Sequence, residues 1–354
     1  MPPLLQFIIR RLFYAVLSLM IITMVLYAGV MLSPPEARAQ LYFPRGKGAE
    51  RATEGYLRSI IRDHHLDRPY LVQYGYWVKS LIEGDWGYSP TLREDVLPAL
   101  LRRTPVTLEL ALYSLLVLVP LGLASGLIAG WKPREGFDNT FRSMAFFGTT
   151  MPPFIFSFVL LSLFYVNLDW FAPGRLSFEY SLEISKEAFR AHTGMVTIDS
   201  LLNGRLDILW DALKHLVMPV LTLSMYHWAT LGRITRTTII AERDKEHILA
   251  AKARGIPERK LMWRYAFRSV LVPSLTSVAL SAAAMLTGVL VVEAIFDLKG
   301  LSAVIVGSMN SAPDAPAALG FSVYSVLLVI GLMFLLDIAQ AILDPRVREE
   351  VLKT

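Results

Sequence analysis

The stretch that decides the organisation of this chain is residues 233–273, RITRTTIIAERDKEHILAAKARGIPERKLMWRYAFRSVLVP. It contains ten Lys or Arg residues against four acidic ones, and residues 215–232 before it and 269–292 at its end lack Asp, Glu, Lys and Arg. A charge-free run of about 18 residues or more can cross a membrane as a helix. The sequence therefore predicts a basic loop that joins two membrane-spanning helices.

Two helices separated by a tight turn are expected inside this loop. Apolar residues recur at helical spacing between Ile248 and Ile256. Gly255 lies where the first helix should end, because glycine takes up the left-handed C-cap conformation without steric cost. Pro257 can begin the next helix but cannot continue the first one.

A pair of small residues, Ala250 and Ala251, lies on the first of these helices. Small side chains let another backbone or an aromatic ring approach closely, as they do where helices pack tightly. The pair is therefore expected to form a knob that fits a socket on a partner protein. The alternative is an amphipathic interfacial loop whose positive charge only sets the topology.

Composition places the chain among integral membrane proteins. Hydrophobic residues make up 54% of the 354 residues, the mean hydropathy is +0.46, and charged residues make up 18%. Soluble domains have roughly 25% charged residues. An all-α protein is expected, with six transmembrane helices in the six charge-free stretches that are long enough: 12–35, 110–131, 143–168, 215–232, 269–292 and 315–336.

The net charge of +5 is distributed unevenly along the chain. If the six helices alternate in direction, Arg10, Arg11, the loop 132–142 and the loop 233–272 fall on one side of the membrane. Cytoplasmic loops carry the excess of Lys and Arg, so both termini are expected in the cytoplasm. This placement favours contact with anionic lipid headgroups over a nucleic-acid partner.

Motifs for nucleotide or metal chemistry are missing from the sequence. It has no cysteine, no G-x-x-x-x-G-K-[ST] phosphate-binding loop, no H-E-x-x-H and no G-x-S-x-G. The adjacent His64 and His65 lack a third ligand at useful spacing, and His215 and His227 lie about 120° apart around a helix. The chain itself is therefore expected to bind no ATP and no metal, and not to be an enzyme.

Polar segments at 33–104 and 169–214 are expected on the outer side of the membrane. The second span should begin after Thr104, a suitable N-cap that precedes a proline. Glu109 lies about one turn inside that span, where a carboxylate must face protein or water. It is a candidate for the solute pathway, and the alternative is an ion pair with the adjoining Arg102 or Arg103.

Three further residues are candidates for the pathway or its mouth. Pro152 and Pro153 must interrupt backbone hydrogen bonding in the third stretch, and a neighbouring helix or a cavity has to satisfy the freed groups. The resulting kink could line a pathway or only serve packing. Glu293 follows the fifth stretch and lies at the mouth of that span.

The run AAKARGIPERKLMWRYAFRSVLVP, residues 250–273, resembles the EAA loop of ABC-importer permeases, specifically the oligopeptide/dipeptide group. HLDRPYLVQYGYW, PVTLELAL, MPPFIFSFVLL, HLVMPVLTLSMYHW and VVEAIFDLKGL resemble further parts of the same family. Two features depart from the general EAA pattern. Leu249 stands where that pattern has a glutamate, and the spacing from Gly255 to Pro273 is longer than in sugar-importer permeases, as expected for the peptide group.

The resemblance implies the ABC type I importer permease fold, with ATPase coupling through Ala250, Ala251, Arg254, Gly255 and Pro257. The expected parts are an N-terminal helix in 1–35, an extracytoplasmic segment in 36–104, a five-helix transmembrane domain in 105–343 that contains the coupling loop 233–272, and a cytoplasmic tail in 344–354.

The function implied by the resemblance is that of a permease subunit in a prokaryotic cytoplasmic membrane, which carries oligopeptides or dipeptides delivered by an extracytoplasmic binding protein. A homologous second permease and two ATPase subunits, which bind ATP and Mg, complete the expected assembly in the lipid bilayer. The alternative is an ion-coupled secondary transporter with Glu109, Glu293 or Asp337 as carrier. These acids flank their spans, whereas such carriers lie near the bilayer midplane, and this favours the importer.

Overall fold

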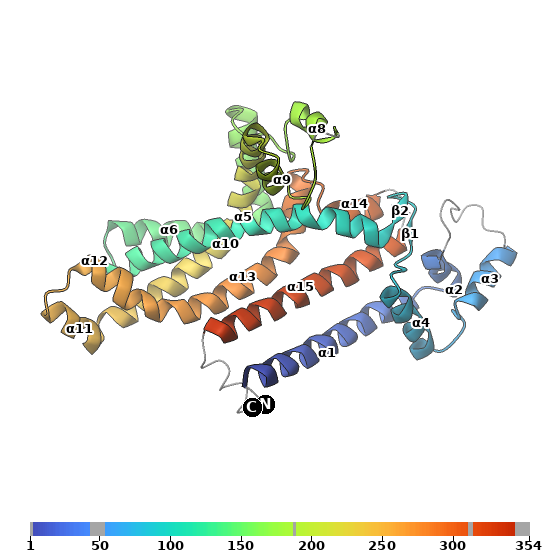
Figure 1. Ribbon diagram of the computed structural model, residues 1–354, viewed down its shortest axis with the longest axis horizontal. Coiled ribbons are helices and arrows are strands. Elements are labelled where there is room, and N and C mark those ends of the chain that lie inside the picture. The colour runs from blue at the N-terminus through green and yellow to red at the C-terminus, as the bar shows by residue number, and fades with distance from the viewer. Residues whose placement is uncertain (1–2, 43–53, 187–188, 311–313, 344–354) are drawn as a thin grey trace. The chain divides into compact units, whose positions relative to one another are not determined.

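The computed structural model describes residues 3–42, 54–186, 189–310 and 314–343, and most of them are helical (Figure 1). They divide into two compact units. The first contains the described residues of Met1–Pro105 and Lys299–Ile338, and the second those of Val106–Leu298 and Ala339–Val347. The tail predicted at 344–354 lies outside the described residues.

The first unit joins the N-terminal helix, the polar segment that follows it and most of the last helix. Its elements are α1 (Pro3–Met31), α2 (Pro35–Arg38), a 3₁₀ turn (Ala39–Tyr42), α3 (Glu54–Asp63), α4 (Tyr70–Ile82), β1 (Tyr88–Ser89), β2 (Glu94–Asp95), the start of α5 (Val96–Trp131), α14 (Ser302–Asn310) and α15 (Ala315–Leu343).

Aromatic side chains hold α4 against the C-terminal part of α1. The ring of Tyr27, which is 1% exposed, stacks on that of Trp77 with the centroids 4.9 Å apart. The hydroxyl groups of Thr23 and Tyr74 are hydrogen-bonded at 2.8 Å, and Val323 of α15 completes the cluster. The polar segment is thus anchored to spans within its own unit.

The buried Asp314 fixes the β1–β2 hairpin and the start of α15 at the same time. Its Oδ2 accepts hydrogen bonds from Ser89 Oγ at 2.5 Å and from Thr91 N at 3.1 Å. Its Oδ1 accepts one from Ala317 N at 3.0 Å, which caps the N-terminus of α15. One carboxylate therefore satisfies donors from two elements that are far apart in sequence.

The second unit contains the remaining spans and the basic connection. Its elements are the rest of α5, α6 (Gly136–Thr150), α7 (Pro153–Leu160), a π-helical segment (Leu161–Asn167), α8 (Phe178–Ile184), α9 (Val196–Leu202), α10 (Leu206–Arg243), α11 (Glu246–Ala253), α12 (Glu258–Lys260), a second π-helical segment (Leu261–Ala266) and α13 (Phe267–Ile295).

Three glycines of α5 let that helix lie directly against α10. Gly122, Gly126 and Gly130 are spaced four residues apart and share one face. A Cβ atom on Gly126 would lie 2.4 Å from the carbonyl oxygen of Gly232, and one on Gly130 would lie 2.6 Å from that of Arg236. Such close backbone approach through small residues is how helices associate in lipid, where the hydrophobic effect does not drive them together.

α13 packs along α10 on another side, and the two helices run side by side in Figure 1. Leu223 of α10 lies in one buried cluster with Met285 and Val289 of α13. The sequence segment 274–292 is rich in Ser, Ala, Thr and Gly, which suits a helix in close contact with a neighbour.

Five helices in the described part of the chain are long and apolar enough to cross a membrane: α1, α5, α10, α13 and α15. The pair α6–α7 makes a sixth span if it is counted as one, although it bends by 109°. Met151 and Pro152 are extended there, with ψ angles of 120° and 138°. Two consecutive prolines remove two N–H donors, so the predicted interruption is present and is sharper than a kink.

Two helix boundaries differ from the sequence prediction. α10 continues past residue 232 to Arg243, so the basic connection is shorter than 233–272. Arg236 forms an ion pair with Asp138 of α6 at 2.5 Å, so α10 continues as a helix beyond the charge-free stretch. α5 begins at Val96, and Thr104 is therefore not an N-cap; its Oγ1 bonds to the carbonyl of Leu100 inside the helix at 2.8 Å.

Candidate functional site

The connection between α10 and α13 contains the helix, turn and helix that the sequence predicts. α11 ends in a Schellman motif, with Gly255 at a φ of +77°. The N–H of Gly255 donates to Lys252 O at 2.9 Å, and that of Ile256 donates to Ala251 O at 3.3 Å. Pro257 precedes α12, which continues through the second π-helical segment into α13 without a further loop.

One face of α11 is buried inside the chain. Ile248 is 2% exposed and belongs to a cluster that includes Leu127 of α5, Ile239 of α10 and Val270 of α13. Ala251 lies on the same face and is fully buried. The prediction that Ala250 and Ala251 together fill a partner's groove is therefore wrong for Ala251, because packing within the chain already covers it.

The opposite face of α11 is open to a partner. Leu249 is 51% exposed, and Ala250 and Ala253 are exposed beside it. These three residues, the α11 outer face, form a small apolar patch. Exposed basic residues surround it, namely Lys252, Arg254, Arg259 and Lys260. Such a surface suits a groove that is apolar at its centre and acidic at its rim.

Polar contacts fix the base of α11 to two spans. Arg243, the last residue of α10, donates from Nη1 to the carbonyl oxygen of Trp131 at the end of α5, at 3.0 Å. The buried carboxylate of Glu242 contacts Lys245 Nζ at 2.6 Å and His247 Nε2 at 3.1 Å. Polar contacts therefore tie the start of α11 to α10, and the end of α10 to α5.

Residues of α10 line two hollows in the apolar part of the second unit. One, of about 530 Å³, lies between α10 and α13; its lining is mostly apolar and includes the hydroxyl-bearing residues Tyr226, Thr230 and Ser277. The other, of about 160 Å³, adjoins it at Tyr226 and includes Pro153. Hydroxyl groups can bond to a polar solute, and polar residues in a span normally face protein or a water-filled space.

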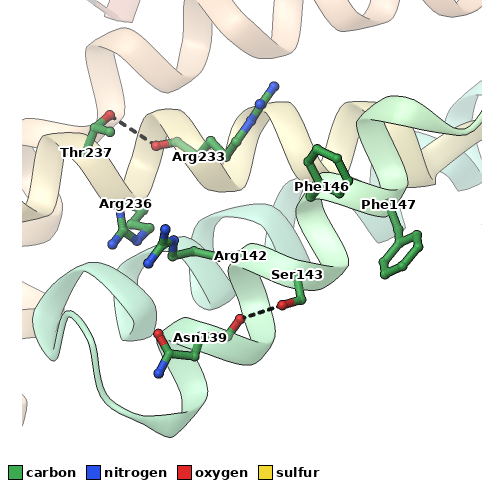
Figure 2. Close-up of a pocket in the computed structure, with 8 residues that line it drawn as sticks. All are labelled: Asn139, Arg142, Ser143, Phe146, Phe147, Arg233, Arg236 and Thr237. Carbon is green, nitrogen blue, oxygen red and sulfur yellow. Dashed lines mark hydrogen bonds between the residues drawn. The ribbon is translucent and has the colours of Figure 1, made fainter.

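A third and larger pocket, of about 670 Å³, opens between α6 and α10 (Figure 2). Asn139, Arg142, Ser143, Phe146 and Phe147 line it from α6, and Arg233, Arg236 and Thr237 line it from α10. In Figure 2 the guanidinium groups of Arg142 and Arg236 lie at one end and the two phenylalanine rings at the other. From the sequence, these arginines contribute only to the uneven distribution of positive charge. The sequence gives no sign that α6 and α10 lie side by side, so it does not predict the pocket.

Glu109 and Glu293 are buried anchors within the second unit. Glu109 Oε2 accepts from Arg175 Nη2 at 3.0 Å, and its Oε1 accepts from Thr197 N at 2.8 Å. Glu293 is fully buried and accepts from Thr107 Oγ1 at 2.5 Å. The carboxylates of both residues are thus engaged by the chain itself.

The two arginines predicted as alternative partners of Glu109 form ion pairs with another carboxylate. Arg102 and Arg103 contact Glu94 at 2.5 and 3.1 Å, in the first unit. The ion pair expected for Glu109 is present, but its basic partner comes from the second polar segment rather than from the start of α5.

Known proteins resemble this chain over almost its whole length. The family described as binding-protein-dependent transport system inner membrane component matches residues 122–349, and its N-terminal companion matches residues 4–111. The di/tripeptide transport system permease protein DppB of Pseudomonas aeruginosa is 29% identical over 98% of this chain and 99% of its own length.

Two further relatives support the same assignment. The probable D,D-dipeptide transport system permease protein DdpB of Escherichia coli is 30% identical over 84% of this chain and 86% of its own length. The dipeptide transport system permease protein DppB of Bacillus subtilis is 29% identical over 97% of this chain and 98% of its own. The chain belongs to the family of inner membrane components of binding-protein-dependent transport systems.

Proposed function

We propose that the chain is the permease subunit of an ATP-driven importer of short peptides, and that α11 couples it to an ATPase. The observation that carries this proposal is the α11 outer face, an exposed apolar patch on a helix whose other face is packed against α5, α10 and α13. The names of the related permeases support di- and tripeptides as the substrate class.

The coupling follows from how α11 is mounted. When two ATPase subunits close on ATP and Mg, a rigid-body displacement of α11 moves the C-terminal end of α10 and the N-terminal end of α13 together. The hollow of about 530 Å³ between these helices changes shape with them. ATP binding and hydrolysis take place in the partner subunits, and this chain contributes the path.

The assembly that this function requires contains a second, homologous permease. Transporters of this kind place the path between two halves that rock against each other. An extracytoplasmic binding protein delivers the peptide, and both termini of this chain lie in the cytoplasm, where α11 reaches the ATPases. This orientation agrees with the excess of Lys and Arg around α11.

An ion-coupled secondary transporter is the competing function, and the acidic residues argue against it. Glu109 and Glu293 are held by hydrogen bonds within the chain, and Asp337 contacts Arg11 at 3.3 Å in the first unit. A carboxylate that carries a proton or sodium ion has to bind and release that ion in every transport cycle. Hydrogen bonds and ion pairs that hold the carboxylate in place oppose this exchange.

Affinity purification of the tagged full-length chain from its native membrane tests the proposal. We expect two ATPase subunits and one similar permease to co-purify, and reconstituted vesicles to take up short peptides only with ATP and the binding protein present. Peptide uptake driven by a proton or sodium gradient without ATP would refute the importer.

A further inference from the structure

The pocket between α6 and α10 (Figure 2) lies beside the ends of two charge-free stretches. Arg142 immediately precedes the charge-free stretch 143–168, and Arg233 immediately follows the charge-free stretch 215–232. Both arginines therefore lie at the level of lipid headgroups if these stretches span the hydrocarbon core. Phosphate groups of phospholipids occupy this level.

The pocket carries more positive than negative charge. The carboxylate nearest to its arginines, that of Asp138, is fully buried and already accepts from Arg236 Nε at 2.5 Å, Arg236 Nη2 at 2.8 Å and the N–H of Arg134 at 2.8 Å. Arg142 and Arg233 are exposed, and within the described residues neither forms an ion pair with a carboxylate. Two guanidinium groups are thus available to an anion.

The other end of the pocket is apolar. Phe146 is 65% exposed and Phe147 is 63% exposed, and both follow Arg142 on α6 toward the interior of the apolar stretch. In Figure 2 the side chain of Arg233 extends away from that of Arg142, so an anion bound by both arginines has to draw these two exposed side chains together. Exposed guanidinium groups at one end and exposed aromatic rings at the other match an amphipathic ligand that has an anionic head and a hydrocarbon body.

We propose that this pocket binds an anionic phospholipid, such as phosphatidylglycerol. Arg142 and Arg233 hold its phosphate, and its acyl chains lie along Phe146 and Phe147. The bound lipid bridges α6 and α10 and offsets the repulsion between their arginines. The lipid site does not depend on the transported solute or on the ATPase. Its place in the cytoplasmic leaflet of the membrane rests on the topology proposed above.

Lipid binding can be measured on the full-length chain together with the subunits that co-purify with it. The sample is reconstituted into nanodiscs with mixtures of phosphatidylglycerol and phosphatidylcholine, and the lipid retained after release into detergent is counted by native mass spectrometry. We expect selective retention of phosphatidylglycerol. Arg142→Gln or Arg233→Gln should each weaken it about 5-fold, and the double variant about 30-fold.

Arg268→Gln is the matched control. Arg268 is exposed and immediately precedes the charge-free stretch 269–292, but it does not line the pocket. Arg268→Gln should leave the amount of retained lipid unchanged, although it removes one positive charge, as each pocket variant does. If the double glutamine variant does not fold, the single variants, compared at equal monodisperse yield, keep the test valid.

Three results would overturn the lipid site. Equal retention of the two phospholipids by the wild type would show that the pocket does not select an anion. An equal loss in Arg268→Gln would assign the effect to general surface charge. Displacement of phosphatidylglycerol by millimolar inorganic phosphate or by a dipeptide would assign the pocket to a soluble anion or to the transported solute. Peptide uptake is measured separately, so a failure here is distinguishable from a failure of the importer proposal.

Discussion

Glu109 of α5 and Arg175 of the second polar segment form an ion pair of 3.0 Å across 66 residues of sequence. The Glu109 side chain is 3% exposed, and its second oxygen accepts hydrogen bonds from the N–H and the hydroxyl of Thr197, at 2.8 and 2.6 Å. Arg175 also donates to the carbonyl of Gly194 at 2.6 Å. One buried carboxylate thus ties the segment that carries α8 and α9 to a membrane span.

Glu109→Gln should loosen this segment. We expect the free energy of unfolding to fall by about 2 kcal/mol, which is less than for a completely buried pair because the Arg175 side chain is 27% exposed. Thermal melting in detergent and limited proteolysis between residues 169 and 205 measure the effect. Glu179→Gln changes an exposed residue of the same segment, and it should alter neither the melting temperature nor the proteolysis. Equal melting of Glu109→Gln and the wild type would show that the ion pair contributes nothing.

Gly126→Ala should destabilise the contact between α5 and α10. The added Cβ would lie 2.4 Å from a backbone oxygen, which cannot move as a side-chain tip can. Overpacking of this kind typically costs about 1–3 kcal/mol. Gly29→Ala in α1 is the matched control, because no atom lies within 4 Å of its added Cβ. Membrane accumulation and melting temperature should fall only for Gly126→Ala, and unchanged values would contradict the close approach.

Gly255→Val should disturb the end of α11 without a clash. No atom lies within 4 Å of a Cβ on Gly255, so the cost is conformational, about 1–2 kcal/mol for a left-handed backbone that carries a β-branched side chain. We expect normal insertion and yield, with reduced ATP hydrolysis by the assembled transporter. Gly255→Asn should be milder, because asparagine tolerates this conformation. Equal activity of the valine variant and the wild type would show that the turn geometry does not matter.

Local features of the fold could be predicted from the sequence. Gly255 and Pro257 specify a turn through their own backbone preferences, and charge-free stretches specify spans through their length. The structure has both features. The apolar stretch alone does not fix where a helix ends, because an ion pair such as Arg236 with Asp138 lets the helix continue beyond it.

Contacts between distant residues could not be predicted in the same way. The burial of Ala251 depends on helices that pack against α11, and a helix of eight residues gives too little pattern to decide which face is covered. For Glu109 the sequence offered nearby arginines, whereas the structure uses Arg175. The glycines of GLASGLIAG, residues 122–130, do indicate a close helix contact, but they do not name α10 as the partner.

The central claim is that the α11 outer face binds an ATPase, and Ala250→Glu tests it most directly. Ala250 is exposed, so the substitution leaves the fold intact, whereas Ala251→Glu would bury a carboxylate and lower the yield. The measurement is the amount of ATPase subunit retained on the tagged, purified chain, with the exposed Ala191→Glu as control. We predict that Ala250→Glu inserts normally but weakens ATPase association by about 2–5 kcal/mol, so that little ATPase is retained, while Ala191→Glu retains the wild-type amount. Wild-type retention of the ATPase by Ala250→Glu would contradict the claim.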